Sequence, residues 1–380
     1  MFSSNRKSSK YGAYAHHGEL RGHSGAILAM SATEDGKFLA SGGTQATSGT
    51  DGTRIFDIRT MRAVETPQSS EWRGPTTAVL WLKREDDAVD GLVSGSQRGY
   101  LFCWETAKQR ARIAGSLAIT ETYCVRLIKP VEITGLAYDP PTRRLAVCHR
   151  GGIVQVFRMP LTPVYTIELP GIVPRAVAFG QLRGNERDVL VFSLYDGEIY
   201  QLRGRDGTAS HLWNVGGLIG HAEVDVQKGV VCIDDPSTGT SIYRLDDCSR
   251  LKTFQVRVTK KKRIRNVAFV NECKVVVSGS DHGVVYLFDR RSGKTVDELM
   301  VHSYEWIQTV TTSENEGVCT IFAAKSRDLD GPNNISVWRK RDLRASGGTI
   351  LYGILVFVQA CFVVGVAIVV FFNRTDLIRF

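Results

Sequence analysis

The side chains best suited to acid–base or metal chemistry are scattered along this 380-residue chain. No histidine stands in a motif that supplies a nucleophile, and no phosphate-binding Walker loop is present. The pairs Asp86-Asp87 and Asp234-Asp235 lack calcium-loop spacing, which favours solvated turns. We therefore expect no catalytic residue, no metal and no cofactor. The histidines are His16, His17, His23, His149, His211, His221, His282 and His302.

The eight cysteines also lack a chemical pattern. No two of them form Cys-x-x-Cys, so their spacing supports neither a zinc site nor a thioredoxin-like centre. Several lie in expected strands, where a free thiol behaves as a small hydrophobic group, and this favours a reducing compartment. They are Cys103, Cys124, Cys148, Cys232, Cys248, Cys273, Cys319 and Cys361.

Composition is that of a globular domain with a basic excess: 43% hydrophobic, 23% charged and a net charge of +9. Part of the excess lies in two clusters, one over residues 260–265 and one over residues 339–344. A basic surface can face anionic lipid or nucleic acid. The first cluster fits a solvated loop better, and we expect no nucleic-acid partner.

The elements that must position these side chains follow from a repeat. One unit recurs: a short apolar strand, a turn containing glycine, and a second strand that ends in a bulky residue followed by a polar one. Glycine permits the positive φ that a tight hairpin needs. The clearest copies are 38–57, 91–105 and 274–289, and weaker ones are 144–158, 188–203, 229–246 and 318–339.

The bulky residues that close the second strands mark seven units, at intervals of 48, 53, 45, 43, 43 and 50 residues. These intervals are close to the 40–45 residues of a four-stranded propeller blade. The sequence therefore predicts an all-β fold, a seven-bladed β-propeller followed by a single transmembrane α-helix. The closing residues are Phe56, Trp104, Phe157, Leu202, Leu245, Phe288 and Trp338.

At these positions the chain resembles the WD-repeat family. Gly22-His23 opens the first copy and Phe56-Asp57 closes it, while Gly220-His221 opens the fifth and Leu245-Asp246 closes it. Trp104-Glu105, Phe288-Asp289 and Trp338-Arg339 stand where the family has Trp-Asp. The resemblance implies a hydrogen-bond network of His, Ser or Thr, Asp and Trp inside each blade. It assigns His23, Ser41 and Phe56 to such a network, and Ser278 with Phe288 to another, although phenylalanine has no indole N–H.

The resemblance covers residues 13–341, and it also predicts how the ring closes. The last copy ends at its third strand, so the segment 16–21 near the N-terminus should supply the fourth, beside residues 335–339. Closure would remove an exposed sheet edge. Residues 1–12, which are basic and rich in serine with no apolar run behind them, are expected to form a disordered tail.

A second signal lies at residues 349–372, which contain no charged side chain. Twenty apolar residues are enough for a helix to span a bilayer, so we expect these to contact lipid as a transmembrane helix. Residues 342–348 would be a juxtamembrane linker and residues 373–380 a short C-terminal tail. Cations are denser before the segment than after it, which places the propeller in the cytosol. This is a tail-anchored arrangement, at the endoplasmic reticulum or another organelle membrane.

Three functions are open at this stage. The first is a non-enzymatic scaffold that presents a propeller surface to unknown protein partners. The alternative is a guanine-nucleotide exchange factor for a small GTPase of the endoplasmic-reticulum vesicle coat, whose layout is similar. That family has a Gly-rich loop which residues 22–30 do not resemble. The third is a propeller hydrolase, which would need clustered carboxylates or a triad on one rim.

Overall fold

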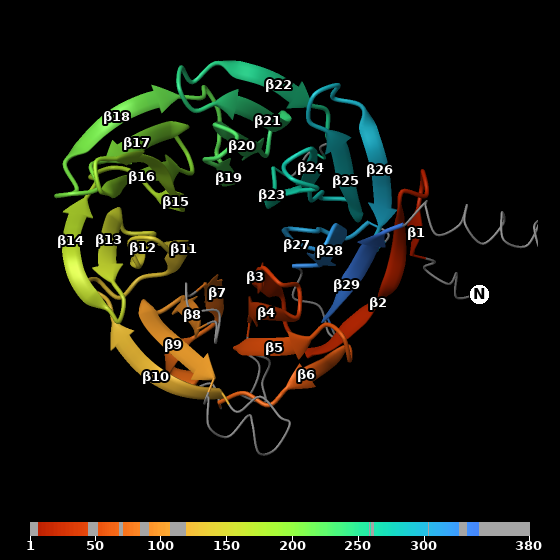
Figure 1. Cartoon of the computed structure of the whole chain (residues 1–380), viewed down its shortest axis with the longest axis horizontal. Coiled ribbons are helices and arrows are strands. Elements are labelled where there is room, and N and C mark those ends of the chain that lie inside the picture. The colour runs from red at the N-terminus through yellow and green to blue at the C-terminus, as the bar shows by residue number, and fades with distance from the viewer. Residues whose placement is uncertain are drawn as a thin grey trace, which may run out of the picture. The chain divides into compact units, whose positions relative to one another are not determined.

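The fold is a ring of seven antiparallel sheets around a central axis (Figure 1). A computed structural model of the chain describes residues 7–44, 52–67, 71–83, 91–106, 119–257, 259, 262–302, 304–326 and 333–341. Within these ranges helix is limited to one 3-10 turn, η1 (Glu71–Arg73). The predicted all-β, seven-bladed propeller is confirmed.

Each blade contains an inner strand, two middle strands and an outer strand. The inner strands are β3 (Ile27–Ala32), β7 (Thr76–Leu82), β11 (Ile133–Asp139), β15 (Pro174–Arg183), β19 (His221–Asp225), β23 (Val267–Val270) and β27 (Thr309–Asn315). The second strands are β4 (Phe38–Gly43), β8 (Gly91–Ser96), β12 (Arg144–His149), β16 (Glu186–Ser193), β20 (Val230–Asp235), β24 (Val275–Ser278) and β28 (Val318–Ala324). The third strands are β5 (Thr53–Asp57), β9 (Tyr100–Thr106), β13 (Ile153–Arg158), β17 (Glu198–Leu202), β21 (Gly239–Arg244), β25 (Val284–Asp289) and β29 (Asn333–Lys340). The outer strands are β6 (Arg62–Val64), β10 (Ile119–Arg126), β14 (Thr162–Glu168), β18 (Ala209–Asn214), β22 (Arg250–Phe254), β26 (Thr295–Met300) and, in the last blade, β2 (Tyr14–His23).

The core lies between neighbouring blades, which explains why many strands are apolar on both faces. Every residue of β12 is buried, whereas the outer strand of the same blade, β14, is mostly exposed or half-buried. Adjacent blades approach closely where a small residue faces the neighbour. A Cβ added at Gly95 would lie 2.5 Å from a methyl carbon of Ile133 in the next blade. Burial against two neighbours fixes each middle strand in register.

The ring closes through the N-terminal strand, as predicted. β2 is the neighbour of β29 in the last sheet, which has the order β2-β29-β28-β27. The Asn334 amide donates to Glu19 at 2.8 Å across this seam, and the rings of His16 and Trp338 meet edge to face at 5.0 Å. Because the first and last parts of the sequence share one sheet, the last blade has no exposed seam.

The N-terminal segment extends further than predicted, and this corrects the expected disordered tail over residues 1–12. Strand β1 (Ser8–Ser9) pairs with β26 and adds a fifth strand to the sixth blade. The buried carboxylate of Asp297 accepts hydrogen bonds from the Ser9 hydroxyl (2.6 Å) and the backbone N–H groups of Tyr11 and Tyr14 (3.0 Å each). Charge-assisted bonds hold this segment where composition alone suggested disorder. Residues 1–6 lie outside the described residues.

The segments expected at and after the linker, residues 342–348, 349–372 and 373–380, lie outside the described residues. In the part of the chain that is described, no helix has the length and apolar character to span a membrane.

Candidate functional site

The predicted blade positions occupy equivalent places in the sheets. The closing side chains are buried opposite the second strand, in the pairs Phe56 with Leu39, Trp104 with Leu92, Phe157 with Leu145, Leu202 with Val189, Phe288 with Val276 and Trp338 with Ile321. The following aspartates cap turns: Asp57 accepts from the backbone N–H of Arg59 at 2.8 Å, and Asp289 from that of Ser292 at 2.7 Å. Their carboxylates fix the turn that leads to the outer strand.

In the fifth blade the closing residue is Tyr243, not Leu245. Tyr243 lies opposite Val231, whereas Leu245 follows the end of β21. Both residues are apolar and two positions apart, so they share one face of an extended chain and spacing alone cannot separate them.

The network implied by the WD resemblance is present in part and altered in part. The His23 imidazole is 2.6 Å from the Ser41 hydroxyl, and its ring lies against Phe56 at 6.4 Å. In the second blade, the Trp104 indole N–H instead donates to Glu121 at 3.2 Å. Arg73 binds the same carboxylate through both terminal nitrogens. These residues stabilise blades.

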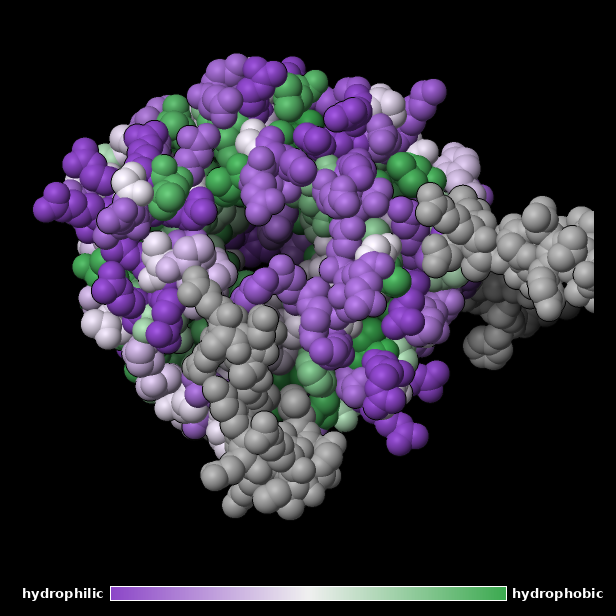
Figure 2. All heavy atoms as spheres, viewed as in Figure 1, coloured by the Kyte–Doolittle hydropathy of each residue, from purple (hydrophilic) through white to green (hydrophobic). Residues whose placement is uncertain are grey.

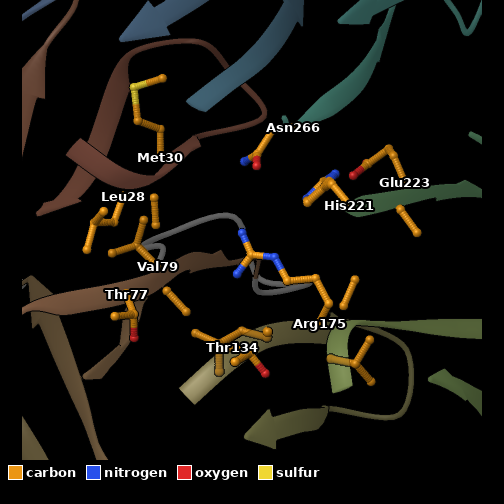
Figure 3. A pocket seen from close by; sticks show the side chains of 16 residues that line it. Leu28, Met30, Thr77, Val79, Thr134, Arg175, His221, Glu223 and Asn266 are labelled. Carbon is orange, nitrogen blue, oxygen red and sulfur yellow. The ribbon is translucent and has the colours of Figure 1, made fainter. Parts of the chain in front are cut away.

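His221 lies elsewhere, although Gly220-His221 looks like the family dipeptide. His23 precedes its inner strand β3 by four residues, whereas His221 is the first residue of β19. Its side chain reaches the central axis of the ring (Figure 3). The structure therefore moves His221 from the expected blade network to the wall of an axial cavity.

The axial cavity has a volume of about 150 Å³ and is lined by the first six blades. Figure 2 shows the ring hollowed at its centre, with hydrophilic residues around the opening. One side of the cavity is apolar and comes from the first two blades. The other side is polar and comes from the fourth to sixth blades (Figure 3). The apolar side includes Leu28, Met30 and Val79, and the polar side Arg175, His221, Glu223 and Asn266.

Arg175 provides the positive charge of the polar side. Its Nε donates to the Gly220 carbonyl at 3.0 Å, and it forms no ion pair with any described residue. The carboxylates whose charges act on Arg175 are Glu132 and Asp234. Glu132 is bound by Arg150 at 3.1 Å, and Asp234 is bound by Arg265 at 2.7 Å. Burial lowers the pKa of Arg175, but a guanidinium stays charged at any physiological pH. Its terminal N–H groups are available to a ligand.

Of the neighbouring polar groups, His221 and Asn266 are neutral at pH 7 and Glu223 is partly ionised. Burial, and then the charge of Arg175, lower the pKa of His221 to about 3. Its Nδ1 accepts from the Val267 backbone N–H at 3.3 Å, so the neutral ring carries its proton on Nε2. Asn266 has a buried amide oxygen with no partner among the described residues. The Glu223 side chain is accessible to solvent through the cavity but is surrounded by protein on its other sides. This burial, together with the nearby Asp225, raises the pKa of Glu223 to about 7.

The cavity lies toward one face of the ring, which we call the cavity face. Its polar residues stand at the start of inner strands, the same end at which third strands begin and outer strands finish. Exposed aromatic and cationic side chains share this face. Trp72, 47% exposed, meets Tyr100 edge to face at 4.6 Å, and Arg126 stacks on Tyr100 at 5.3 Å. Arg263 stacks on Trp306 at 5.2 Å.

Sequence reasoning missed Arg175, Glu223 and Asn266. A signal was present, because each is a polar residue within or just before the first residues of an inner strand. Recognising it requires knowing that the starts of all inner strands meet at the axis.

Comparison with known proteins bears on the fold more than on the site. A family model described as WD domain, G-beta repeat matches residues 15–53. The matched stretch runs from the outer strand of the last blade into the first blade. Together with the seven-bladed ring, it supports a WD-repeat propeller family for this chain. No curated protein matches the chain.

Proposed function

We propose that this protein is a WD-repeat scaffold that is anchored to a membrane by residues 349–372 and binds protein partners on its cavity face, in the cytosol. WD-repeat propellers commonly bind protein partners. The observation that carries the proposal is an asymmetry between the two faces of the ring. The cavity and the stacked arginines lie on one face, whereas β29 finishes at Lys340 toward the other.

The chemistry of the cavity face supports a protein partner. Trp, Tyr and Arg are the residues most enriched at the energetic centres of protein interfaces. Here they occur as stacked pairs, and among the described residues Arg98, Arg126 and Arg263 form no ion pair. A rigid ring with pre-ordered side chains loses little conformational entropy on binding.

The anchor is supported by sequence. Residues 349–372 are uncharged and exceed the length needed to cross a bilayer. The cations at positions 339–341 and 344 would lie near the anionic cytoplasmic leaflet, at about 1 kcal/mol each. β29 ends at Lys340, and the eight residues 341–348 that follow reach at most about 29 Å, so the ring would work close to the membrane.

Neither other function has an observation in its favour. Exchange-factor activity would need a nucleotide-expelling loop, and no described segment suggests one. Among the described lining residues Glu223 is the single carboxylate, and Asp234, which lies outside the lining, is engaged by Arg265, so the cavity holds no hydrolytic pair or triad there.

The topology is tested with sealed microsomes from cells that express the full chain. We expect the protein to resist carbonate extraction, and external protease to digest the ring without detergent. Deletion of residues 349–380 should release a folded ring into the cytosol. A ring that is protected until detergent is added would place it in the lumen and reject the proposal.

The scaffold role is tested by proximity labelling with the full chain and with the double variant Trp72→Ala, Arg126→Ala. Both side chains are exposed on the cavity face, so the variant should fold. The control is Arg203→Ala with Arg205→Ala on the opposite face. We expect the cavity-face variant to lose specific neighbours and the control to keep them. Equal labelling by all three proteins would contradict partner binding on this face.

A further inference from the structure

We propose that the axial cavity binds a carboxylate carried on a short apolar stem, and that its source is an acidic side chain of a partner peptide inserted from the cavity face. Arg175 is the ion-pair partner of that carboxylate. The inference rests on the proposed scaffold function and identifies the chemistry that its central site recognises.

Arg175 carries a positive charge that no described residue compensates. Arg175 would normally be paired when it is enclosed by protein, because isolated charges are costly to remove from water. Asp234, the partner of Arg265, lies on β20 in the blade that precedes Arg265. The equivalent position on β12, in the blade that precedes Arg175, is occupied by Cys148. Burial raises the pKa of the Cys148 thiol to about 11, so it brings no negative charge. The cavity therefore presents a cation whose expected partner is absent from the described residues.

Side-chain N–H donors lie around Arg175 in the cavity. His221 holds its proton on Nε2 because Nδ1 accepts from Val267. The carboxamide of Asn266, from the next blade, carries both a donor and an acceptor, and Figure 3 shows all three side chains directed into the same space. An arginine fork with additional N–H donors matches a carboxylate, which has only acceptors.

The charges and apolar residues that line the cavity favour a carboxylate over a phosphate. A phosphate dianion is usually held by several cations, and in the described part of the cavity Arg175 is the single cationic side chain. Glu223 in the same wall disfavours a second negative charge. The opposite wall, with Leu28, Met30 and Val79, provides apolar contact for a methylene stem. A cavity of about 150 Å³ has room for one side chain and not for a folded element.

The experiment uses the full chain in detergent micelles and follows binding by fluorescence anisotropy. The probe is a labelled, end-blocked peptide, Gly-Ser-Leu-Glu-Leu-Ser-Gly. Its matched peptides carry Gln or phosphoserine in place of Glu, and free 4-methylpentanoate serves as competitor. We expect the Glu peptide to bind saturably, the Gln peptide at least about tenfold more weakly, and 4-methylpentanoate to compete only at higher concentration.

Three variants locate the site. Arg175→Met should weaken the Glu peptide about 10- to 100-fold, and Arg175→Lys should recover part of that loss because it keeps the charge but not the fork. Cys148→Asp keeps Arg175 but gives it an internal carboxylate, and should abolish binding as well. Arg203→Met, an exposed arginine of the opposite face, is the control and should bind as the parent does. Circular dichroism verifies the fold of each variant.

Several results would overturn the inference. Equal binding of the Gln peptide, or of Arg175→Met, would exclude a carboxylate at Arg175. Tighter binding of the phosphoserine peptide would assign the site to phosphate, and tighter binding of free 4-methylpentanoate would assign it to a small molecule. Absence of saturable binding by every probe would also reject it. Proximity labelling with Arg175→Met separates this failure from failure of the scaffold role: unchanged neighbours would reject the axial site and leave cavity-face binding intact.

Discussion

Two arginines on either side of the fifth blade begin nearly the same sequence but have different surroundings. Residues 175–179 read Arg-Ala-Val-Ala-Phe and residues 265–269 read Arg-Asn-Val-Ala-Phe. In each segment, the valine two residues after the arginine pairs with the second strand of its blade. Val177 pairs with Val191, and Val267 pairs with Ser278. They therefore occupy equivalent positions at the beginning of two inner segments, Arg175 within β15 and Arg265 two residues before β23.

Their partners differ. Arg265 is 1% exposed and holds Asp234 through Nε at 2.9 Å and a terminal nitrogen at 2.7 Å. The terminal nitrogen also donates to the Asp235 carbonyl at 2.8 Å. Among the described residues Arg175 has one hydrogen bond, to the Gly220 carbonyl, and its terminal groups face the cavity. One arginine ties two blades together and the other is left for a ligand, and the distinction arises from the neighbouring strand.

The largest expected effect separates these two roles. Arg265→Met should lower the free energy of unfolding by about 3–5 kcal/mol, because it leaves Asp234 buried without its partner. Arg175→Met should change it by less than about 0.5 kcal/mol. Urea unfolding of the full chain in detergent, followed by tryptophan fluorescence, measures both. A cost below about 1 kcal/mol for Arg265→Met would show that Arg175 can take over Asp234, and the comparison would fail.

A second prediction extends the comparison to a buried acid. Asp297 is saturated by donors from the N-terminal segment, so Asp297→Asn should cost about 2–3 kcal/mol, the range for hydrogen bonds to a charged group. The same unfolding assay applies. Asp247→Asn, at an exposed turn where the carboxylate accepts from Ser249 at 3.0 Å, is the control and should leave the urea midpoint close to that of the parent. Similar losses from the two would mean that the N-terminal segment does not stabilise the ring.

The ring itself could be predicted from the sequence because its signals are local. Glycine turns and bulky closing residues repeat at blade spacing, and Trp338 and Phe288 are buried as that pattern required. The closure by β2 followed from an incomplete last unit. The register error at Leu245 arose where two apolar residues two apart satisfied the same pattern.

The site could not be predicted in the same way because the residues that decide the role of each arginine lie far from it in the sequence. The sequences around Arg175 and Arg265 hardly differ, and the residues that decide their roles, Cys148 and Asp234, are 27 and 31 positions away. His221 was misplaced for a related reason, since Gly-His reads alike before a strand and at its first residue. Only the arrangement of inner strands around the axis distinguishes these cases.

The smallest effect concerns the neutral neighbour of Arg175. Burial and Arg175 lower the folded-state pKa of His221 to about 3, from an ordinary value near 6.5. The unfolded chain therefore binds more protons between these values, so His221 favours folding above about pH 6.5 and this contribution is lost as pH falls toward 3. At pH 5 the loss amounts to about 1–2 kcal/mol.

His221→Asn keeps an acceptor for the Val267 N–H but does not titrate, so between pH 7.5 and pH 5 it should lose less stability than the parent. His211→Asn, at an exposed histidine beside Glu198, is the control and should follow the parent. Urea midpoints at the two pH values test this prediction: if the parent and His221→Asn lose equal stability, His221 is not kept neutral in the folded ring by its burial and the charge of Arg175.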